Sequence, residues 1–211
     1  MNIGVVPARL ASKRLPKKIL ADLDGKPMVA HTMEQVLKAQ KLDKVILAID
    51  SEETLDALKD FGFDMVMTSK DHCSGTDRVA EVVKKNEDAE VIINIQGDEP
   101  LIDANIIDDL LGLFEDKDVN MGTAISTKLR VDDLLDDNVV KAIIDQDKNV
   151  IDFKRNIYDS EIGGLYRHIG IYGFRRNTLF QFSMLDQSPR EKKRKLEQMR
   201  ALDNDLPIRA T

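Results

Sequence analysis

Five cations lie within ten residues near the N-terminus, and a cluster of this kind can bind phosphate. They belong to PARLASKRLPKK, residues 7–18, which directly follows the apolar run Ile3–Val6. Arginine binds phosphate oxygens bidentately and lysine acts as a point charge. The segment is not a P-loop, because the pattern GxxxxGK[ST] is absent. A solvated basic turn is the alternative interpretation of the same residues.

A second candidate site is NIQGDEP, residues 94–100, at the end of the apolar run VIINI. Asp98 and Glu99 could bind a divalent cation, since Mg²⁺ commonly takes one or two carboxylates together with substrate phosphates. The alternative is an acidic turn that caps a helix ahead of Pro100. Ligands of open α/β sheets bind beyond the carboxyl ends of the strands. A basic loop and an acidic turn at two such ends together indicate phosphate chemistry on a nucleotide.

Three further segments give weaker signals. HCSGTDR, residues 72–78, predicts a helix start whose free backbone N–H groups could meet an anion or a base edge, although an ordinary helix cap is the alternative. RHIGIYG, residues 167–173, predicts a strand with His168 and Tyr172 on one face, yet a histidine in an apolar strand is more often structural. LEQMR, residues 196–200, lies in a charged stretch that a solvated helix face would also explain.

Apolar runs and helical spacings predict the elements that position these segments. In the first half we expect strands at 3–6, 44–49, 64–67 and 91–95, and helices at 28–39, 53–60 and 76–85. In the second half we expect helices at 104–114 and 189–202, and strands at 122–126, 139–144, 150–153 and 167–174. Strands that alternate with helices predict βαβ units and a mostly parallel sheet. The chain is therefore expected to be a single α/β domain, with a nucleotide-binding half at 1–125 and a more antiparallel half at 126–211.

The composition excludes several classes of protein. The 211 residues hold 31 Lys and Arg against 38 Asp and Glu, a net charge of −7 that argues against non-specific nucleic-acid binding. One cysteine excludes an intrachain disulfide and a cysteine-based zinc site. No run approaches 18 apolar residues, and the N-terminus lacks the arrangement of a signal peptide. We expect a cytoplasmic protein that neither enters a membrane nor binds nucleic acid.

The five segments, in this order and at these spacings, resemble the CMP-Kdo synthetases, which are 3-deoxy-manno-octulosonate cytidylyltransferases. The resemblance covers essentially the whole chain, and NIQGDEP and RHIGIYG are its most specific motifs. It implies a Rossmann-like nucleotidyltransferase fold of the nucleotide-diphospho-sugar transferase type, with an inserted antiparallel section that forms a homodimer. It also implies the Mg²⁺-dependent reaction CTP + Kdo → CMP-Kdo + diphosphate, for lipopolysaccharide synthesis. Relatives that activate sialic acids share the N-terminal pattern but differ at QGDEP.

The resemblance further implies which residues form the site. Those expected to bind the nucleotide are Pro7, Ala8, Arg9, Arg14, Lys18, Ser74, Gly75, Arg78, Gln96 and Asp98. Those expected to bind the sugar acid are Gln96, His168, Tyr172, Glu197 and Gln198. The expected catalytic residues are Lys18, Arg14 and Asp98. Lys18 would stabilise the transition state and the leaving diphosphate, and Asp98 would be the metal ligand.

Two departures from the family pattern leave alternatives open. The family usually has glycine before the catalytic lysine, whereas this chain has Lys17, so either lysine could reach the phosphates. The pattern also continues with G-x-D-T-P-[ED]-D-L, whose aspartate is a second metal ligand, whereas this sequence ends at Thr211. We therefore expect the chain to bind CTP and turn over slowly. The alternatives are a cytidylyltransferase for 8-amino-Kdo or a sialic-type acid, and a non-catalytic nucleotide-binding relative.

Overall fold

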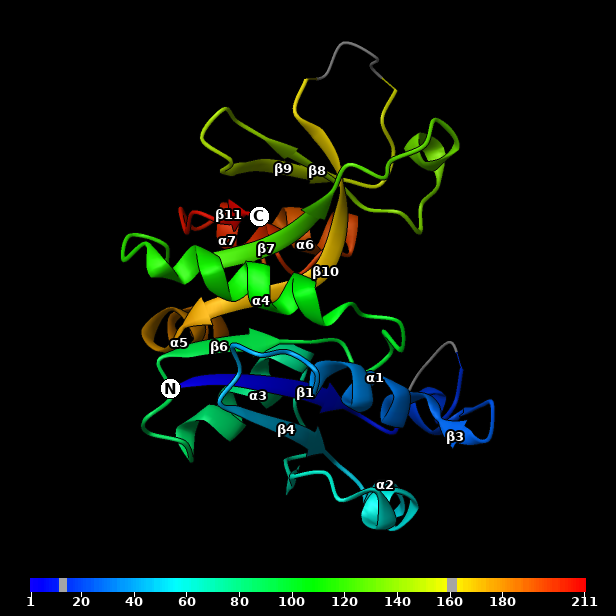
Figure 1. The fold of residues 1–211 in the computed structure, drawn as a ribbon. Helices are drawn as coiled ribbons and strands as arrows, with labels where there is room; N and C mark the ends of the chain where they lie inside the picture. Colours follow the sequence, from blue (N-terminus) through cyan, green and yellow to red (C-terminus); the bar gives the residue numbers. More distant parts are fainter. Residues whose placement is uncertain (12–14, 159–162) are drawn as a thin grey trace. The chain divides into compact units, whose positions relative to one another are not determined.

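The computed structural model describes residues 1–11, 15–158 and 163–211. They form two compact units, Met1–Gly112 (unit 1) and Leu113–Thr211 (unit 2) (Figure 1). The expected halves met at residue 125, but the division falls earlier. The reason is that β7 (Met121–Ser126) pairs with strands of unit 2, so the whole strand belongs there.

Unit 1 is built on four parallel strands in the order β6-β1-β4-β5. Their bounds are β1 Asn2–Ala8, β4 Lys44–Ile49, β5 Met65–Met67 and β6 Val91–Asn94. Val5 lies opposite Ile46, and Gly4 lies opposite Ile93. The predicted parallel α/β core is confirmed. Because the strands are parallel, the segments that follow β1, β4, β5 and β6 all leave from one edge of the sheet.

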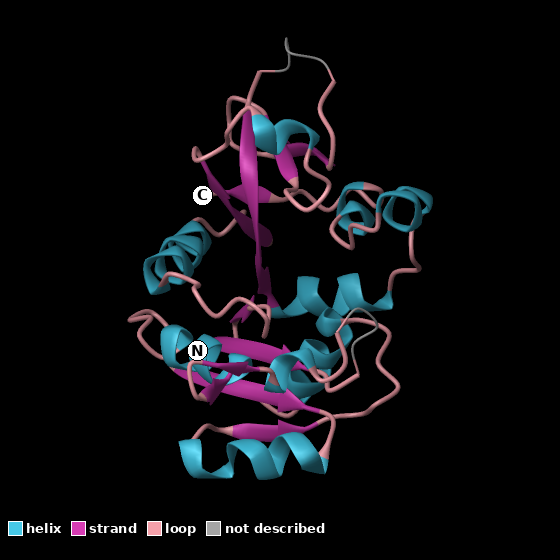
Figure 2. Ribbon diagram, turned by 90° about the vertical axis from the view of Figure 1, so that its right-hand side faces the viewer, coloured by secondary structure: helices cyan, strands magenta, loops and turns pink. Residues whose placement is uncertain are grey.

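Helices cover both faces of this sheet (Figure 2), and β4 and β6 are buried as their unbroken apolar runs predict. The helices of unit 1 are α1 Met28–Val36, η1 Lys18–Leu20, α2 Glu52–Leu58, η2 Lys59–Phe61, α3 Gly75–Lys84 and α4 Ala104–Gly112. A small hairpin joins β2 (Asp22–Leu23) and β3 (Lys26–Pro27). Helix α2 begins after Ser51 and helix α3 after Ser74, and each serine accepts a backbone N–H of its first turn.

Unit 2 holds the antiparallel section that the sequence predicts. Its strands are β7, β8 (Lys141–Ile144), β9 (Val150–Lys154), β10 (Leu165–Arg175) and β11 (Arg209–Ala210), in the order β11-β7-β10-β8-β9. All neighbours are antiparallel except β11 and β7. The helices are η3 Leu113–Glu115, η4 Asp132–Leu135, α5 Arg176–Met184, α6 Pro189–Arg194 and α7 Met199–Leu202.

One helix prediction in unit 2 was wrong, and one helix was missed. The expected helix at 189–202 is interrupted, because Lys195 has a left-handed backbone (φ 55°) and ends α6. Helix α5 was not predicted at all, since its sequence RNTLFQFSM has few apolar residues at helical spacing.

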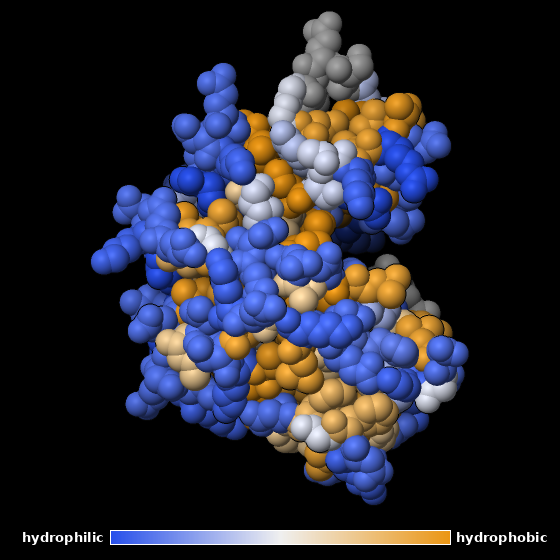
Figure 3. Space-filling view, viewed as in Figure 1, coloured by the Kyte–Doolittle hydropathy of each residue, from blue (hydrophilic) through white to orange (hydrophobic). Residues whose placement is uncertain are grey.

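Hydrophilic residues cover much of the face seen in Figure 3, in keeping with a chain in which 33% of residues are charged. Among the described residues, no helix combines the length and apolar character that crossing a membrane requires.

Candidate active site

Three of the predicted motifs meet at Pro7, the penultimate residue of β1. A Cβ atom built on Gly97, in the acidic turn after β6, would lie 2.9 Å from the carbonyl oxygen of Pro7. A Cβ atom on Gly75, at the start of α3, would lie 3.4 Å from Pro7 Cγ. Only glycine allows the acidic turn to come this close to β1. Thr32 on α1 holds the turn from the other side, since its Oγ1 donates to the Gly97 carbonyl at 3.1 Å.

The basic loop and the acidic turn are joined directly by Lys18 and Asp98. Lys18 Nζ lies 2.7 Å from Asp98 Oδ2, and both side chains are about one-third exposed. The two residues are 80 positions apart in the sequence and come together only because β1 and β6 are neighbours. At this edge the partly exposed cation could bind a phosphate oxygen, and the partly exposed carboxylate could bind a metal ion attached to that phosphate.

Lys17 points to a different partner. Its Nζ lies 2.5 Å from Glu53 Oε1 on α2, and its backbone is left-handed with φ 56°. Glycine adopts this conformation without steric cost, which accounts for the glycine that the resembled family usually has here. Of the two lysines, the geometry therefore favours Lys18 as the one that meets phosphate.

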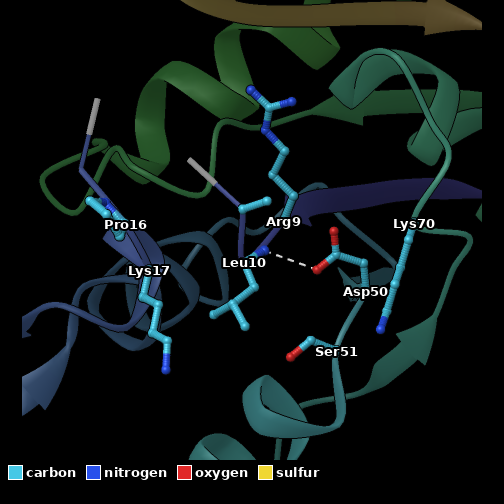
Figure 4. Close-up of a pocket in the computed structure, with 8 residues that line it drawn as sticks. Arg9, Leu10, Pro16, Lys17, Asp50, Ser51 and Lys70 are labelled. Atoms are coloured by element: carbon cyan, nitrogen blue, oxygen red, sulfur yellow. Dashed lines mark hydrogen bonds between the residues drawn. The ribbon is translucent and has the colours of Figure 1, made fainter. Parts of the chain in front are cut away.

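Asp50, the residue after β4, anchors the start of the basic loop. Its Oδ1 accepts the backbone N–H of Leu10 at 2.9 Å (Figure 4), and its Oδ2 accepts an N–H of Arg78 Nη2 at 3.0 Å. Arg78 also donates to Thr68 Oγ1 and is only 2% exposed. Burial lowers the pKa of Arg78, and the nearby Asp50 charge counteracts that shift. Arg78 was expected to bind the nucleotide, and in the structure its guanidinium group faces Asp50 and Thr68.

A pocket of about 560 Å³ opens beside this anchor, within unit 1. It is lined by Arg9, Leu10, Ala11, Pro16, Lys17, Asp50, Ser51 and Lys70. Arg9 is exposed, and Figure 4 shows its side chain extending away from Asp50 and Lys17. Arg14 lies outside the described residues. Ser74 and Gln96 are partly exposed, at the start of α3 and after β6 respectively, so both stand at the same sheet edge as Lys18.

In unit 2 the structure brings together two of the residues expected to bind the sugar acid. Tyr172 Oη and His168 Nε2 on β10 lie 3.0 Å apart, and Thr123 Oγ1 on β7 lies 3.0 Å from the same nitrogen. Thr123 Oγ1 donates its proton to the Ile171 carbonyl at 2.8 Å, so it accepts from His168. This assigns the neutral tautomer with its proton on Nε2 and leaves the Tyr172 hydroxyl proton available to a ligand.

Burial keeps both groups uncharged. It lowers the pKa of His168 to about 3, and it raises the pKa of Tyr172 well above 10, with the Glu197 charge adding to that rise. Neither side chain therefore changes its charge near neutral pH. They can hold the hydroxyl groups of a ligand rather than act as acid or base.

The pKa of His168 predicts a specific acid sensitivity. His168 has a pKa near 6.5 in the unfolded chain and about 3 in the folded chain, so proton binding favours unfolding between pH 6.5 and pH 3. The contribution of neutral His168 to the free energy of unfolding is fully present above pH 6.5. It falls by up to about 1.4 kcal/mol per pH unit as the pH falls towards 3. Urea unfolding from pH 7 to pH 4 should therefore show a steeper loss for the natural protein than for His168→Asn. Parallel curves would contradict the assignment.

The remaining two residues of the sugar-acid set follow α6. Gln198 is buried, and Glu197 lies 3.8 Å from Arg200 Nη2. Arg200 forms a buried bidentate pair with Glu191, at 2.9 and 2.7 Å, which ties α7 to α6.

Sequence reasoning missed two residues of these sites. They are Asp50 and Thr123, because the role of each depends on partners that are distant in the sequence.

Taken together, the parallel sheet, the cationic loop after β1 and the carboxylate after β6 define a nucleotidyltransferase type of α/β protein. The chain belongs to the cytidylyltransferase family, whose model, described as "Cytidylyltransferase", matches residues 3–208. Its similarity to named relatives extends over nearly its whole length.

Two of these relatives are named 3-deoxy-manno-octulosonate cytidylyltransferase. The one from Geobacter sulfurreducens is 39% identical over 99% of this chain and 90% of its own, and the one from Solibacter usitatus is 43% identical over 98% and 84%. Among solved structures, a CMP:2-keto-3-deoxy-manno-octonic acid synthetase complexed with CTP matches with a TM-score of 0.91 and 33% identity. That match covers 100% of this chain and 88% of the other.

Proposed function

We propose that this protein activates Kdo with CTP, forming CMP-Kdo and diphosphate for lipopolysaccharide synthesis. The observation that carries the proposal is the contact of 2.7 Å between Lys18 and Asp98, a cation and a carboxylate side by side beyond the carboxyl ends of β1 and β6, where an α/β sheet binds its ligand. The names of the relatives favour Kdo over the other sugar acids.

The reaction needs one bond to form and one to break at the α-phosphorus of CTP. The anomeric hydroxyl of the sugar attacks the α-phosphorus and its proton passes to solvent, while the bond from the α-phosphorus to the oxygen that bridges the α- and β-phosphates breaks and diphosphate leaves. Lys18 and Arg9 stabilise the charge that develops on the phosphates, and positioning supplies much of the remaining acceleration. Neutral His168 and Tyr172 hold hydroxyl groups of the sugar acid.

Mg²⁺ fits the residues at this edge through Asp98. The described residues contain no group of three or more His, Cys, Asp or Glu side chains that could enclose a metal. One carboxylate plus substrate oxygens and water is, however, a common donor set for Mg²⁺. When bound, the ion would neutralise phosphate charge and draw phosphate and sugar carboxylate together. We further propose that the protein acts in the cytoplasm as a homodimer.

The test is diphosphate release by the protein with CTP and Mg²⁺, with Kdo present or omitted. We expect release that requires Kdo and that stops when EDTA removes the metal. Parallel reactions with 8-amino-Kdo and N-acetylneuraminate decide the sugar class. Faster release with either of them than with Kdo would show that this other sugar acid is the substrate. Binding of CTP without diphosphate release for any sugar acid would contradict the assignment as an enzyme.

A further inference from the structure

Lys141 on β8 is buried in an unusual way. It is 0% exposed and is among the largest fully buried side chains of the described residues. Its Nζ donates to the carbonyl oxygens of Asp136 at 3.0 Å and Val139 at 2.7 Å, and to that of Arg155. An ammonium group has three N–H donors, so each has a backbone acceptor.

A buried ammonium group is costly, and a methionine of similar size would avoid the cost. Burial lowers the pKa of Lys141, while nearby carboxylates, of which Asp136 has the largest effect, raise it. The ammonium group joins two separate backbone segments, residues 136–139 and Arg155, by hydrogen bonds that an apolar side chain could not form.

The first connection leads to His168. Lys141 holds the turn at residues 136–139, and Val140 follows this turn directly. The carbonyl oxygen of Val140 accepts the backbone N–H of His168 at 2.9 Å. Lys141 itself lies opposite Arg167 in the β8–β10 register. The backbone position of His168 thus depends on a turn that is fixed from inside by the ammonium group.

The second connection leads to the segment after α6. Arg155, whose carbonyl the ammonium group holds, donates through Nε to the Arg194 carbonyl at 3.0 Å and through Nη2 to the Lys195 carbonyl at 3.1 Å. These carbonyls end α6, and Glu197 and Gln198 follow directly. Lys141 is therefore linked through the backbone both to His168 and to the segment that carries Glu197 and Gln198.

We propose that Lys141 is a positioning residue for the sugar-acid side of the site: its ammonium group holds three backbone carbonyls and through them sets His168 and the segment of Glu197 and Gln198. The proposal rests on the proposed function, because it assumes that these residues meet the sugar. It assigns no contact between Lys141 and substrate. It predicts that loss of the ammonium group impairs use of the sugar and leaves CTP binding intact.

The experiment compares Lys141→Met and Lys141→Gln with Lys154→Met. Lys154 is a matched control, because it lies opposite Lys141 in the β8–β9 register and is only partly buried. We expect the Lys141 variants to raise KM for Kdo by about tenfold or more, as loss of orienting partners does elsewhere, with an unchanged Kd for CTP. The ring signal of His168, one of three histidines, should shift in ¹H–¹⁵N spectra of the Lys141 variants and stay in place in the control.

A folded Lys141→Met protein with natural KM and an unshifted His168 signal would overturn the proposal. Failure of the natural protein to release diphosphate with any sugar acid would instead overturn the proposed function. If neither Lys141 variant folds, ¹⁵N-lysine labelling of the natural protein decides. A slowly exchanging Lys141 ammonium signal that moves on addition of Kdo supports the proposal, and a rapidly exchanging or unresponsive signal refutes it.

Discussion

Replacement of Lys18 by methionine is expected to lower kcat for diphosphate release by about 10²–10³-fold, the usual effect of losing one group that stabilises transition-state charge. Lys18 is the cation that the structure places against the carboxylate of the acidic turn, 2.7 Å from Asp98. Methionine keeps most of the length of the unbranched apolar stem and removes the ammonium group, with its charge and its three N–H donors. The kinetics should be measured at saturating CTP and Kdo, so that weaker binding does not appear as slower turnover.

Lys17→Met is the matched control for this prediction. Lys17 is the next residue in the chain and carries the same charge, but its ammonium group contacts Glu53 on α2. Exposed ion pairs contribute about 0–1 kcal/mol, so kcat and stability should both remain close to those of the natural protein. Equal losses of kcat in the two variants would show that the loop needs total charge rather than Lys18, and an unaffected Lys18→Met enzyme would exclude its catalytic role.

The parallel core was predictable because its signal is local. The strand Lys44–Ile49 was predicted with the observed bounds, and α3 begins within one residue of its expected start, since β-branched apolar runs and serine caps act over a few residues. The antiparallel section was also predictable from strands that follow each other with few helices between them. The interrupted helix was not, because the left-handed turn at Lys195 is held by Arg155, 40 positions away.

The site could be predicted in its residue types but not in its pairings. A basic loop after β1 and an acidic turn after β6 were recognisable, yet nothing local says that Lys18 rather than Lys17 reaches Asp98. That choice depends on a left-handed backbone at Lys17 and on the position of Glu53. Asp50 was overlooked for the same reason, because its partners are the distant Leu10 and Arg78.

Removal of one partner from the Asp50–Arg78 pair is expected to lower the free energy of unfolding by about 3–5 kcal/mol. The two side chains are 9% and 3% exposed, so an unpaired charge left behind would have little water to solvate it. Asp50→Asn retains an oxygen that can accept the Leu10 N–H, while it removes the charge that faces Arg78. Arg78→Met leaves the opposite charge unpaired. Urea unfolding of both variants measures the loss.

The double variant Asp50→Asn with Arg78→Met separates the pair from its surroundings. It buries no unpaired charge, so it should regain much of the stability that either single change loses, as double-mutant cycles of contacting residues do. Additive losses would show that the two charges are not coupled, and single losses below about 1 kcal/mol would be typical of an exposed pair instead.

The same variants test whether stability and nucleotide binding have a common origin at this edge of the sheet. Asp50 joins the backbone of Leu10, beside Arg9, to a guanidinium group on α3, so it holds the basic loop against the helix whose start carries Ser74. If that connection positions the loop, the Kd for CTP should rise in Asp50→Asn and stay raised in the double variant, since restoring stability does not restore the link to α3. If the pair serves stability alone, the Kd should return to its natural value together with the free energy of unfolding.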